Sequence, residues 1–288
     1  IELNLNKNRG VADNAIVKFY GVPIFYLPKY SWVLSGRGSG FLTPNYNKYT
    51  ETGQNKSSYS LRVPYYFNIA PDRDLKVALT YMSSRRFIYE GKYRKLIAPK
   101  ISNDHDDSIW SLEAKYLPED KVTSLKRWLV NFSEEMDLSD KTHLSAQFYR
   151  VSDKKYFEEI ARSNTDVKTL ESYLKFTYKD KEKNLNAEVI SEAEQVVNTG
   201  TSSYTRELEG SISKTFKIID KMPIQVGLIS TNFAHKSLSK TAGVRTHGNL
   251  GISRLLNIEY PKVTPSASVT ITNYSLKNNP NINRTILG

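Results

Sequence analysis

The stretch Leu75-Lys76-Val77-Ala78-Leu79-Thr80-Tyr81 decides the fold class, because a large apolar side chain occupies every second position. In an extended strand, successive side chains point to opposite faces of the sheet, so a period of two gathers the apolar side chains on one face. The stretch therefore predicts a β-strand with one apolar and one polar face.

The same alternation recurs along most of the chain, for example in Leu170 to Tyr178, Leu185 to Val189 and Ala267 to Thr272. Turn-forming sequences such as Ala70-Pro71-Asp72-Arg73-Asp74 separate these segments. We therefore predict about twelve hairpin-linked antiparallel strands after residue 57, each about ten residues long, which is the length that crosses a bilayer in a membrane barrel. Strands of soluble sandwiches are commonly shorter.

One segment predicts a short helix instead. Ser152 is a candidate N-cap, and Tyr156, Phe157 and Ile160 follow at helical spacing before the pattern ends near Ser163. Because the helix is short and interrupts a run of strands, we expect it to decorate a loop.

The first fifty residues differ from the rest. Asn14 to Tyr20 and Val22 to Leu27 predict two strands, and Ser35-Gly36-Arg37-Gly38-Ser39-Gly40 predicts a loop or linker. We place a domain boundary near residues 45–55, which gives one domain over residues 1–50 and a second over residues 51–288.

The composition suits a folded protein, since 39% of the 288 residues are hydrophobic and 25% are charged. The longest charge-free apolar run, Tyr20 to Pro28, is far shorter than the roughly 20 residues of a membrane-spanning helix. The absence of cysteine excludes disulfides and thiolate metal sites. The first residues show neither an initiator Met nor a signal pattern, so we predict a mature product or an internal fragment.

The net charge of +11 favours a polyanionic partner. Nucleic acid, anionic lipid and acidic glycolipid all fit this charge, because lysine and arginine create a long-range field that attracts any polyanion. Two readings therefore stay open beside the one developed below, a general outer-membrane porin and a soluble basic β-protein that binds nucleic acid.

Several blocks of sequence resemble one known family, the lipopolysaccharide-assembly outer-membrane proteins (LptD, or organic solvent tolerance proteins). The blocks occur in the family's order and spacing: Gly21 to Pro28, Arg37 to Pro44, Pro64 to Pro71 with Asp74, Tyr81 to Arg86, Glu113 to Pro118 with Asp120, and Arg150 to Asp153 leading to Tyr156 and Phe157. Weaker similarity continues through Thr201 to Tyr204 and ends at Asn283 to Thr285.

The resemblance implies an all-β chain, namely the end of a periplasmic β-jelly-roll followed by the N-terminal, incomplete part of a large antiparallel transmembrane β-barrel. It implies transport of lipopolysaccharide into the outer leaflet of the Gram-negative outer membrane, with the N-terminal part in the periplasm. The implied partners are lipopolysaccharide, a plug lipoprotein of the LptE type, a periplasmic bridge protein of the LptA type and outer-membrane lipids, but not nucleic acid.

The resemblance also suggests site residues. Proline cannot donate a hydrogen bond to a neighbouring strand, and prolines in the family's first two barrel strands are linked to a lateral gate. Pro64 matches the first of these prolines, whereas the matching position in the second strand is Leu79. Both residues are gate candidates.

Two further groups are candidates for lipid contact. Val17, Phe19 and Phe25 could line the jelly-roll groove that holds the acyl chains, although ordinary sandwich core explains them equally well. Arg85 and Arg86 could contact lipopolysaccharide phosphates or sugars if they face the barrel lumen, because a guanidinium pairs with phosphate bidentately.

No motif predicts catalysis. His143 and Ser145 share a strand face, as in the His-x-Ser arrangement of outer-membrane phospholipases, but Ala146-Gln147-Phe148 replaces the Asn-Gly-Arg continuation of that family. We therefore predict that the protein is not an enzyme, and we predict no catalytic residue, metal site or cofactor.

Overall fold

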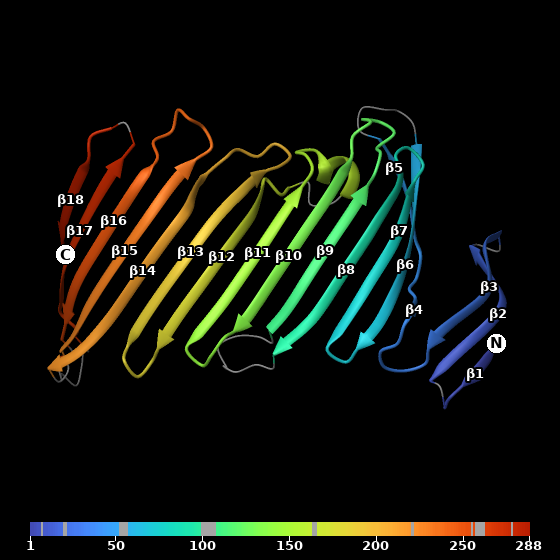
Figure 1. Cartoon of the computed structure of the whole chain (residues 1–288), viewed down its shortest axis with the longest axis horizontal. Coiled ribbons are helices and arrows are strands. Elements are labelled where there is room, and N and C mark those ends of the chain that lie inside the picture. Colours follow the sequence, from blue (N-terminus) through green and yellow to red (C-terminus); the bar gives the residue numbers. More distant parts are fainter. Residues whose placement is uncertain are drawn as a thin grey trace. The chain divides into compact units, whose positions relative to one another are not determined.

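The structure is a computed structural model that describes residues 1–6, 8–19, 22–51, 57–98, 108–162, 166–219, 222–254, 256, 263–277 and 279–288. Strands make up nearly all of its regular structure, and neighbouring strands are antiparallel (Figure 1). The all-β fold class predicted from the alternating pattern is confirmed. Within the described ranges, no helix has the length and apolar character needed to span a bilayer.

The chain divides into two compact units. The first unit comprises residues 1–97, 109–132 and 151–163, and the second comprises residues 98–108, 133–150 and 164–288. The division falls inside strand β10 (Arg127–Asp137), whose first residues belong to the first unit and whose last residues belong to the second.

The first unit contains two sheets. A three-stranded sheet is formed by β1 (Glu2–Asn4), β2 (Arg9–Phe19) and β3 (Val22–Val33). The other strands of the unit belong to a larger sheet: β4 (Gly40–Phe41), β5 (Asn45–Thr50), β6 (Ser57–Ala70), β7 (Arg73–Met82), β8 (Arg86–Ala98), β9 (Ser108–Leu117) and the start of β10. The change of sheet lies between Val33 and Gly40, and the predicted domains 1–50 and 51–288 stay a prediction.

The second unit contains the remaining strands, which pair with their neighbours in chain order: β11 (Thr142–Val151, to Arg150), β12 (Thr169–Asp180), β13 (Leu185–Val196), β14 (Tyr204–Ile219), β15 (Met222–His235), β16 (Gly243–Ser253), β17 (Ser266–Leu276) and β18 (Ile282–Leu287). The described part of the chain thus holds thirteen strands after residue 57, against the predicted number of about twelve. Most are ten residues or longer.

The two faces of the sheet in the first unit differ in polarity because the pairing keeps the alternating side chains in line. One face carries Leu61, Val63, Tyr65 and Phe67 of β6, Leu75, Val77, Leu79 and Tyr81 of β7, and Phe87, Tyr89 and Tyr93 of β8. We call it the apolar face. The opposite, polar face carries Arg62, Pro64, Tyr66 and Asn68, then Asp74, Lys76, Ala78 and Thr80, then Glu90, Lys92 and Arg94.

The second unit repeats this polarity. Its apolar face exposes Phe176, Val189, Ile212, Leu228, Leu250 and Ile271, which are between 40% and 56% accessible. The opposite face carries Glu188, Glu209, Thr231, Arg245, His247 and Thr272. A sheet that exposes its large apolar side chains on one face suits an apolar solvent on that side.

The predicted helix is a single π-helical turn, η1 (Phe157–Ala161), and Phe157 and Ile160 are buried as expected. Its N-cap is Tyr156 rather than Ser152. The reason is that Asp153 turns the chain before the helix starts, since its carbonyl accepts the amide of Tyr156 and its carboxylate accepts the amide of Lys155.

Candidate functional site

The seam, as we call the pairing of β4 and β5 with β6, is interrupted in its middle. Gly40 and Phe41 pair with Tyr66 and Tyr65, and β5 resumes at Asn45 opposite Arg62. Three residues, Leu42 to Pro44, therefore lie opposite two residues of β6, and the amide of Leu42 donates to the carbonyl of Pro64 at 3.0 Å. The seam consists of a two-residue and a six-residue ladder with a break between them.

Prolines on both sides explain the break. Pro64 cannot donate to the ladder from β6, and Pro44 cannot donate from the β4–β5 side. The sequence analysis placed Pro64 in the first strand of the barrel and did not single out Pro44. In the structure, β6 lies between β7 on one side and β4 and β5 on the other, so Pro44 is next to the strand of Pro64. The signal that was missed is the second proline, twenty residues before Pro64.

The two predicted gate residues lie on opposite faces. Leu79 pairs with Val63, is 42% exposed and belongs to the apolar face, whereas Pro64 pairs with Ala78 and is buried on the polar face. Leu79 thus lies away from the break at which Pro64 is placed. The role of both residues in a gate stays a prediction.

Aromatic side chains form rows across the apolar face of the first unit. Tyr46, Tyr59, Tyr81 and Phe87 follow one another across β5 to β8 with ring centroids 5.0 to 6.2 Å apart. Near the other ends of the strands, Phe67 and Tyr93 are level with Leu75, and Tyr93 contacts Trp110. Tyr59 and Phe67 are about 27 Å apart along β6. In a strand tilted as in outer-membrane barrels, this distance spans about 20 Å along the membrane normal, which approaches the height of the apolar band of such barrels.

A buried ion cluster lies beyond one end of the seam. It consists of Glu51, Arg85, Asp120, Arg127, Asp153, Glu159 and Arg162. Arg127 binds Asp153 bidentately at 2.7 and 3.0 Å and also donates to Glu159 at 2.6 Å. Asp120 forms ion pairs with both Arg85 and Arg127. The side chains of Arg85 and Arg127 are only 2% exposed.

The cluster holds the end of β5. The Glu51 carboxylate, which directly follows β5, accepts both Nε and Nη2 of Arg85 and pairs with Arg162 at 2.8 Å. Arg162 also donates to the carbonyl of Thr50 and lies 3.7 Å from the ring centre of Tyr49. The seam strand is therefore tied to the loop that contains η1.

Two carboxylates of the cluster, Glu51 and Asp120, have lowered pKa values. Burial alone would raise the pKa of Glu51, but hydrogen bonds from Arg85 and Ser84 and the charge of Arg162 hold this pKa below its usual range. Burial likewise opposes ionisation of Asp120, whose pKa is nevertheless lowered by the amide of Val122 and by the charge of Arg85. The ion pairs with the arginines offset the cost of burying these two carboxylates.

A second charged group lies beyond the opposite end of the seam, and we call it the linker clamp. Arg37 of the glycine-rich linker donates to Tyr66 Oη, to the carbonyl of Pro71 and to Asp74. Arg94 of β8 binds the same Asp74 carboxylate bidentately at 2.7 and 3.0 Å. The clamp thus joins the linker that follows β3 to the first strands of the larger sheet.

The predicted contact arginines have different environments. Arg85 is buried and engaged by Glu51, Asp120 and Glu159, which argues against the expected contact with lipopolysaccharide. Arg86 is 54% exposed and pairs with Glu119 in the adjacent turn. The predicted groove residues Val17, Phe19 and Phe25 lie in β2 and β3, but their side chains fall outside the described part of the structure.

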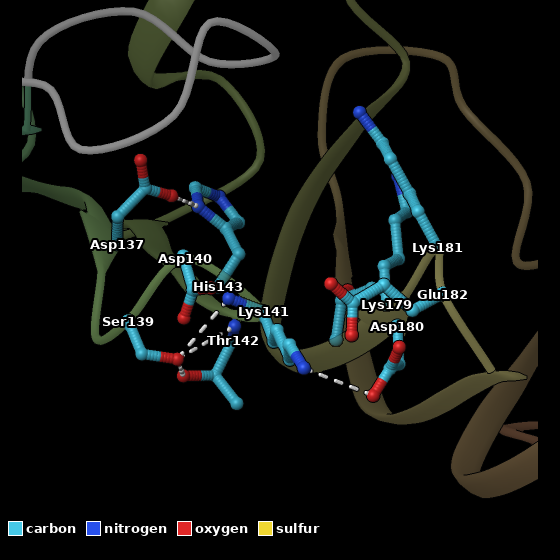
Figure 2. Close-up of a pocket in the computed structure, with 11 residues that line it drawn as sticks. Asp137, Ser139, Asp140, Lys141, Thr142, His143, Lys179, Asp180, Lys181 and Glu182 are labelled. Atoms are coloured by element: carbon cyan, nitrogen blue, oxygen red, sulfur yellow. Dashed lines mark hydrogen bonds and ion pairs between the residues drawn. The ribbon is translucent and has the colours of Figure 1, made fainter.

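A small pocket of about 210 Å³ lies in the second unit, at the turns that precede β11 and follow β12. Figure 2 shows Lys141 extending to Asp180, with which it pairs at 3.1 Å, and His143 beside Asp137. Both ring nitrogens of His143 are engaged by carboxylates, Asp137 and Glu135 at 2.8 Å each. Where the chain is described, no three side chains of His, Cys, Asp or Glu are grouped to hold a metal ion.

Comparison with known proteins links the chain to one family. The family model described as "LPS transport system D", LptD, matches residues 126–286, which is more than half of the chain. Similar curated proteins carry the name LPS-assembly protein LptD. The protein from Cupriavidus pinatubonensis is 34% identical over 57% of this chain and 19% of its own length.

Two further relatives extend the match. The protein from Burkholderia pseudomallei is 31% identical over 58% of this chain and 20% of its own length. The protein from Methylococcus capsulatus is 28% identical over 96% of this chain and 26% of its own length. The chain thus spans about a fifth to a quarter of the length of the curated relatives that it matches.

Proposed function

The chain belongs to the LptD family, and from this premise we propose that it forms part of a translocon that inserts lipopolysaccharide into the outer leaflet of the Gram-negative outer membrane. The observation that carries the proposal is the sheet with one apolar and one polar face, in a chain of this family. The apolar face faces lipid, and the polar face accepts the saccharide as it moves.

The parts of the chain have different tasks in this proposal. Residues 1–50 supply the last strands of a periplasmic jelly-roll, with Val17, Phe19 and Phe25 along a groove for acyl chains. At the end of this range, β4 and β5 pair with β6, the first strand of the proposed barrel. Residues 51–288 supply the first strands of the barrel. The lipid and the saccharide thus travel in separate environments, which an amphiphile requires because its acyl chains avoid water while its sugars bind it.

The seam is the proposed lateral gate. Between Phe41 and Asn45 it lacks regular pairing, and Pro44 and Pro64 keep it from forming a continuous ladder. Strands that share few hydrogen bonds separate at a lower free-energy cost than fully paired ones. Pro64 thus keeps its proposed role in the gate. The second proline of the gate is Pro44, on the opposite side of the seam, because the position that matches the family's second proline is Leu79.

The partners proposed for the complete protein are lipopolysaccharide, a plug lipoprotein of the LptE type and a periplasmic bridge protein of the LptA type. The proposed role is transport and includes no chemical step. The proposed location is the outer membrane, with the N-terminal strands in the periplasm.

Depletion of the complete protein in a Gram-negative host tests the proposal. We expect newly made lipopolysaccharide to accumulate in the inner membrane and periplasm and to decline at the cell surface. Normal surface lipopolysaccharide after depletion would overturn the proposal. Ion conductance in planar bilayers together with normal lipopolysaccharide export would favour the porin alternative.

A further inference from the structure

Two lysines face each other on the polar face of the first unit. Lys76 of β7 and Lys92 of β8 are direct cross-strand partners in the antiparallel register. Directly opposed side chains have Cβ atoms about 5 Å apart, and like charges in such a pair destabilise the sheet. The sequence thus keeps an arrangement that the fold alone would disfavour.

The protein's own carboxylates neutralise this pair poorly. Among the described residues, none holds a carboxylate at ion-pair distance from Lys76, and Lys92 reaches Glu113 only at 3.7 Å. Glu113 is shared with Lys115, which lies closer at 3.2 Å. Few carboxylates therefore compensate the positive charge of the opposed lysines.

The neighbouring side chains leave this positive charge in place, because Glu90, one pleat from Lys92 on the same face, is already paired with Arg62 at 3.0 Å. Arg94 is on the same face one pleat further along β8, and Arg37 shares Asp74 with it. Five cations, Arg37, Lys76, Lys92, Arg94 and Lys115, thus meet two carboxylates, Asp74 and Glu113. An excess of three positive charges is left in a small area.

These cations are accessible and partly fixed in place. The side chains of Lys92 and Arg94 are 46% and 53% exposed. Asp74, which is only 8% exposed, orients Arg94 through its Nε and Nη2, and Tyr66 lies opposite Lys76 on β6. An oriented guanidinium next to two ammonium groups suits an oxyanion with several acceptor oxygens.

We propose that Lys76, Lys92 and Arg94 form a basic patch that binds the phosphate groups on the saccharide of the transported glycolipid. The inference rests on the proposed transport function and names a contact site for it. The patch lies beside the linker clamp, where the chain passes from the three-stranded sheet into the larger sheet. A lipid that leaves the jelly-roll meets its cations before it reaches the rest of the polar face.

Binding of labelled lipopolysaccharide to the purified complete protein in detergent tests the patch. We expect Lys76→Gln/Lys92→Gln to weaken binding about tenfold, since charge-assisted hydrogen bonds are lost. Chemically dephosphorylated lipopolysaccharide should bind equally well to the unaltered protein and to this variant. Inorganic phosphate should compete with lipopolysaccharide on the unaltered protein more effectively than on the variant.

Matched variants separate charge at the patch from charge in general. Lys121→Gln/Lys126→Gln removes two equally charged, exposed side chains from the loop between β9 and β10 and should bind like the unaltered protein. Lys76→Arg/Lys92→Arg should retain binding. The Gln variant should unfold at no lower urea concentration than the unaltered protein, because it relieves a like-charge pair.

Two results would overturn the patch as a saccharide-phosphate site. One is that both Gln variants weaken lipopolysaccharide binding equally. The other is that the patch variant loses as much affinity for phosphatidylglycerol vesicles as for lipopolysaccharide. If the unaltered protein and the patch variant bind lipopolysaccharide equally well and depletion still blocks export, the patch is wrong and the transport function stands. Normal export after depletion removes the transport function, and the patch inference falls with it.

Discussion

The buried ion cluster and the linker clamp both hold guanidinium groups on carboxylates, yet they differ in access to water. Arg85 and Arg127 are 2% exposed, whereas Arg37 and Arg94 are about half exposed. In the cluster four carboxylates meet three guanidinium groups, whereas around the clamp the cations outnumber the carboxylates.

This difference in exposure and pairing indicates which arginines are available to bind a ligand. A buried, paired arginine is committed to structure, because removing its partners leaves an uncompensated charge in a medium of low polarity. An exposed arginine beside weakly paired lysines contributes little to stability and is available for an anion. The cluster therefore fixes the end of β5, and the region of the clamp offers a binding surface.

Arg127→Met should have the largest effect. It leaves Asp153 and Glu159 without their nearest cation and takes one of two arginines from Asp120. Breaking such a buried ion pair lowers the free energy of unfolding by about 3–5 kcal/mol. Urea unfolding of the complete protein in detergent, followed by tryptophan fluorescence, measures the change. The exposed neighbour Lys126→Met is the control, and equal stability of the two variants would show that the cluster does not stabilise the fold.

Acid should weaken the cluster before it affects the paired strands. The pKa values of Glu51 and Asp120 are lowered in the folded state, so their contribution to stability is complete above the ordinary carboxyl pKa of about 4. This contribution is lost as the pH falls from there through the lowered pKa values. Hydrogen exchange at β5 should accelerate in that range, and Glu51→Gln should reduce the acceleration; an unchanged exchange profile in both proteins would contradict this.

Arg37→Ala should have a local effect. Without Arg37 the linker loses its bonds to Tyr66, Pro71 and Asp74, while Arg94 continues to neutralise Asp74. We expect faster hydrogen exchange at Asn68, whose amide is bonded to Ser39 of the linker, and only a small change in urea unfolding. Protection of Asn68 equal to that in the unaltered protein would show that the clamp does not hold the linker.

Arg86→Ala should have the smallest effect. Arg86 and Glu119 are both more than half exposed, and surface ion pairs of this kind contribute about 0.5 kcal/mol or less. Its φ of 93° is also unfavourable for any side chain, so alanine costs no additional backbone strain. The same urea assay should show overlapping curves, whereas a loss comparable with that of Arg127→Met would contradict the assignment of Arg86 to the surface.

The sequence predicted the local elements well. The alternation in Leu75 to Tyr81 appears in β7, and the helical spacing of Phe157 and Ile160 appears in η1. Each of these signals lies within about ten neighbouring residues, so the side chains that define the element are also those that the period describes. The resemblance to the LptD family is confirmed for the same kind of reason, because it rests on blocks of contiguous sequence.

The site was predicted only in part. Pro64 was singled out, but its partner at the break is Pro44, which becomes visible only when β4 and β5 are placed against β6. Arg85 was named with Arg86 as a candidate contact for lipopolysaccharide phosphates or sugars. Carboxylates from residues 51, 120 and 159 instead converge on it, and no local pattern encodes that convergence.

By itself, the sequence determined that the chain forms two-faced antiparallel strands and that it belongs to the LptD family, because strand periodicity and sequence blocks are local properties. Only the tertiary structure decided which charges are buried and which stay open. Lys76 and Lys92 lie on two consecutive strands, and Glu51 and Arg85 are 34 residues apart in the chain; strand register brings the first pair together and loop packing the second. Electrostatic environment is a property of that three-dimensional neighbourhood, so the roles of the charged residues followed from the fold.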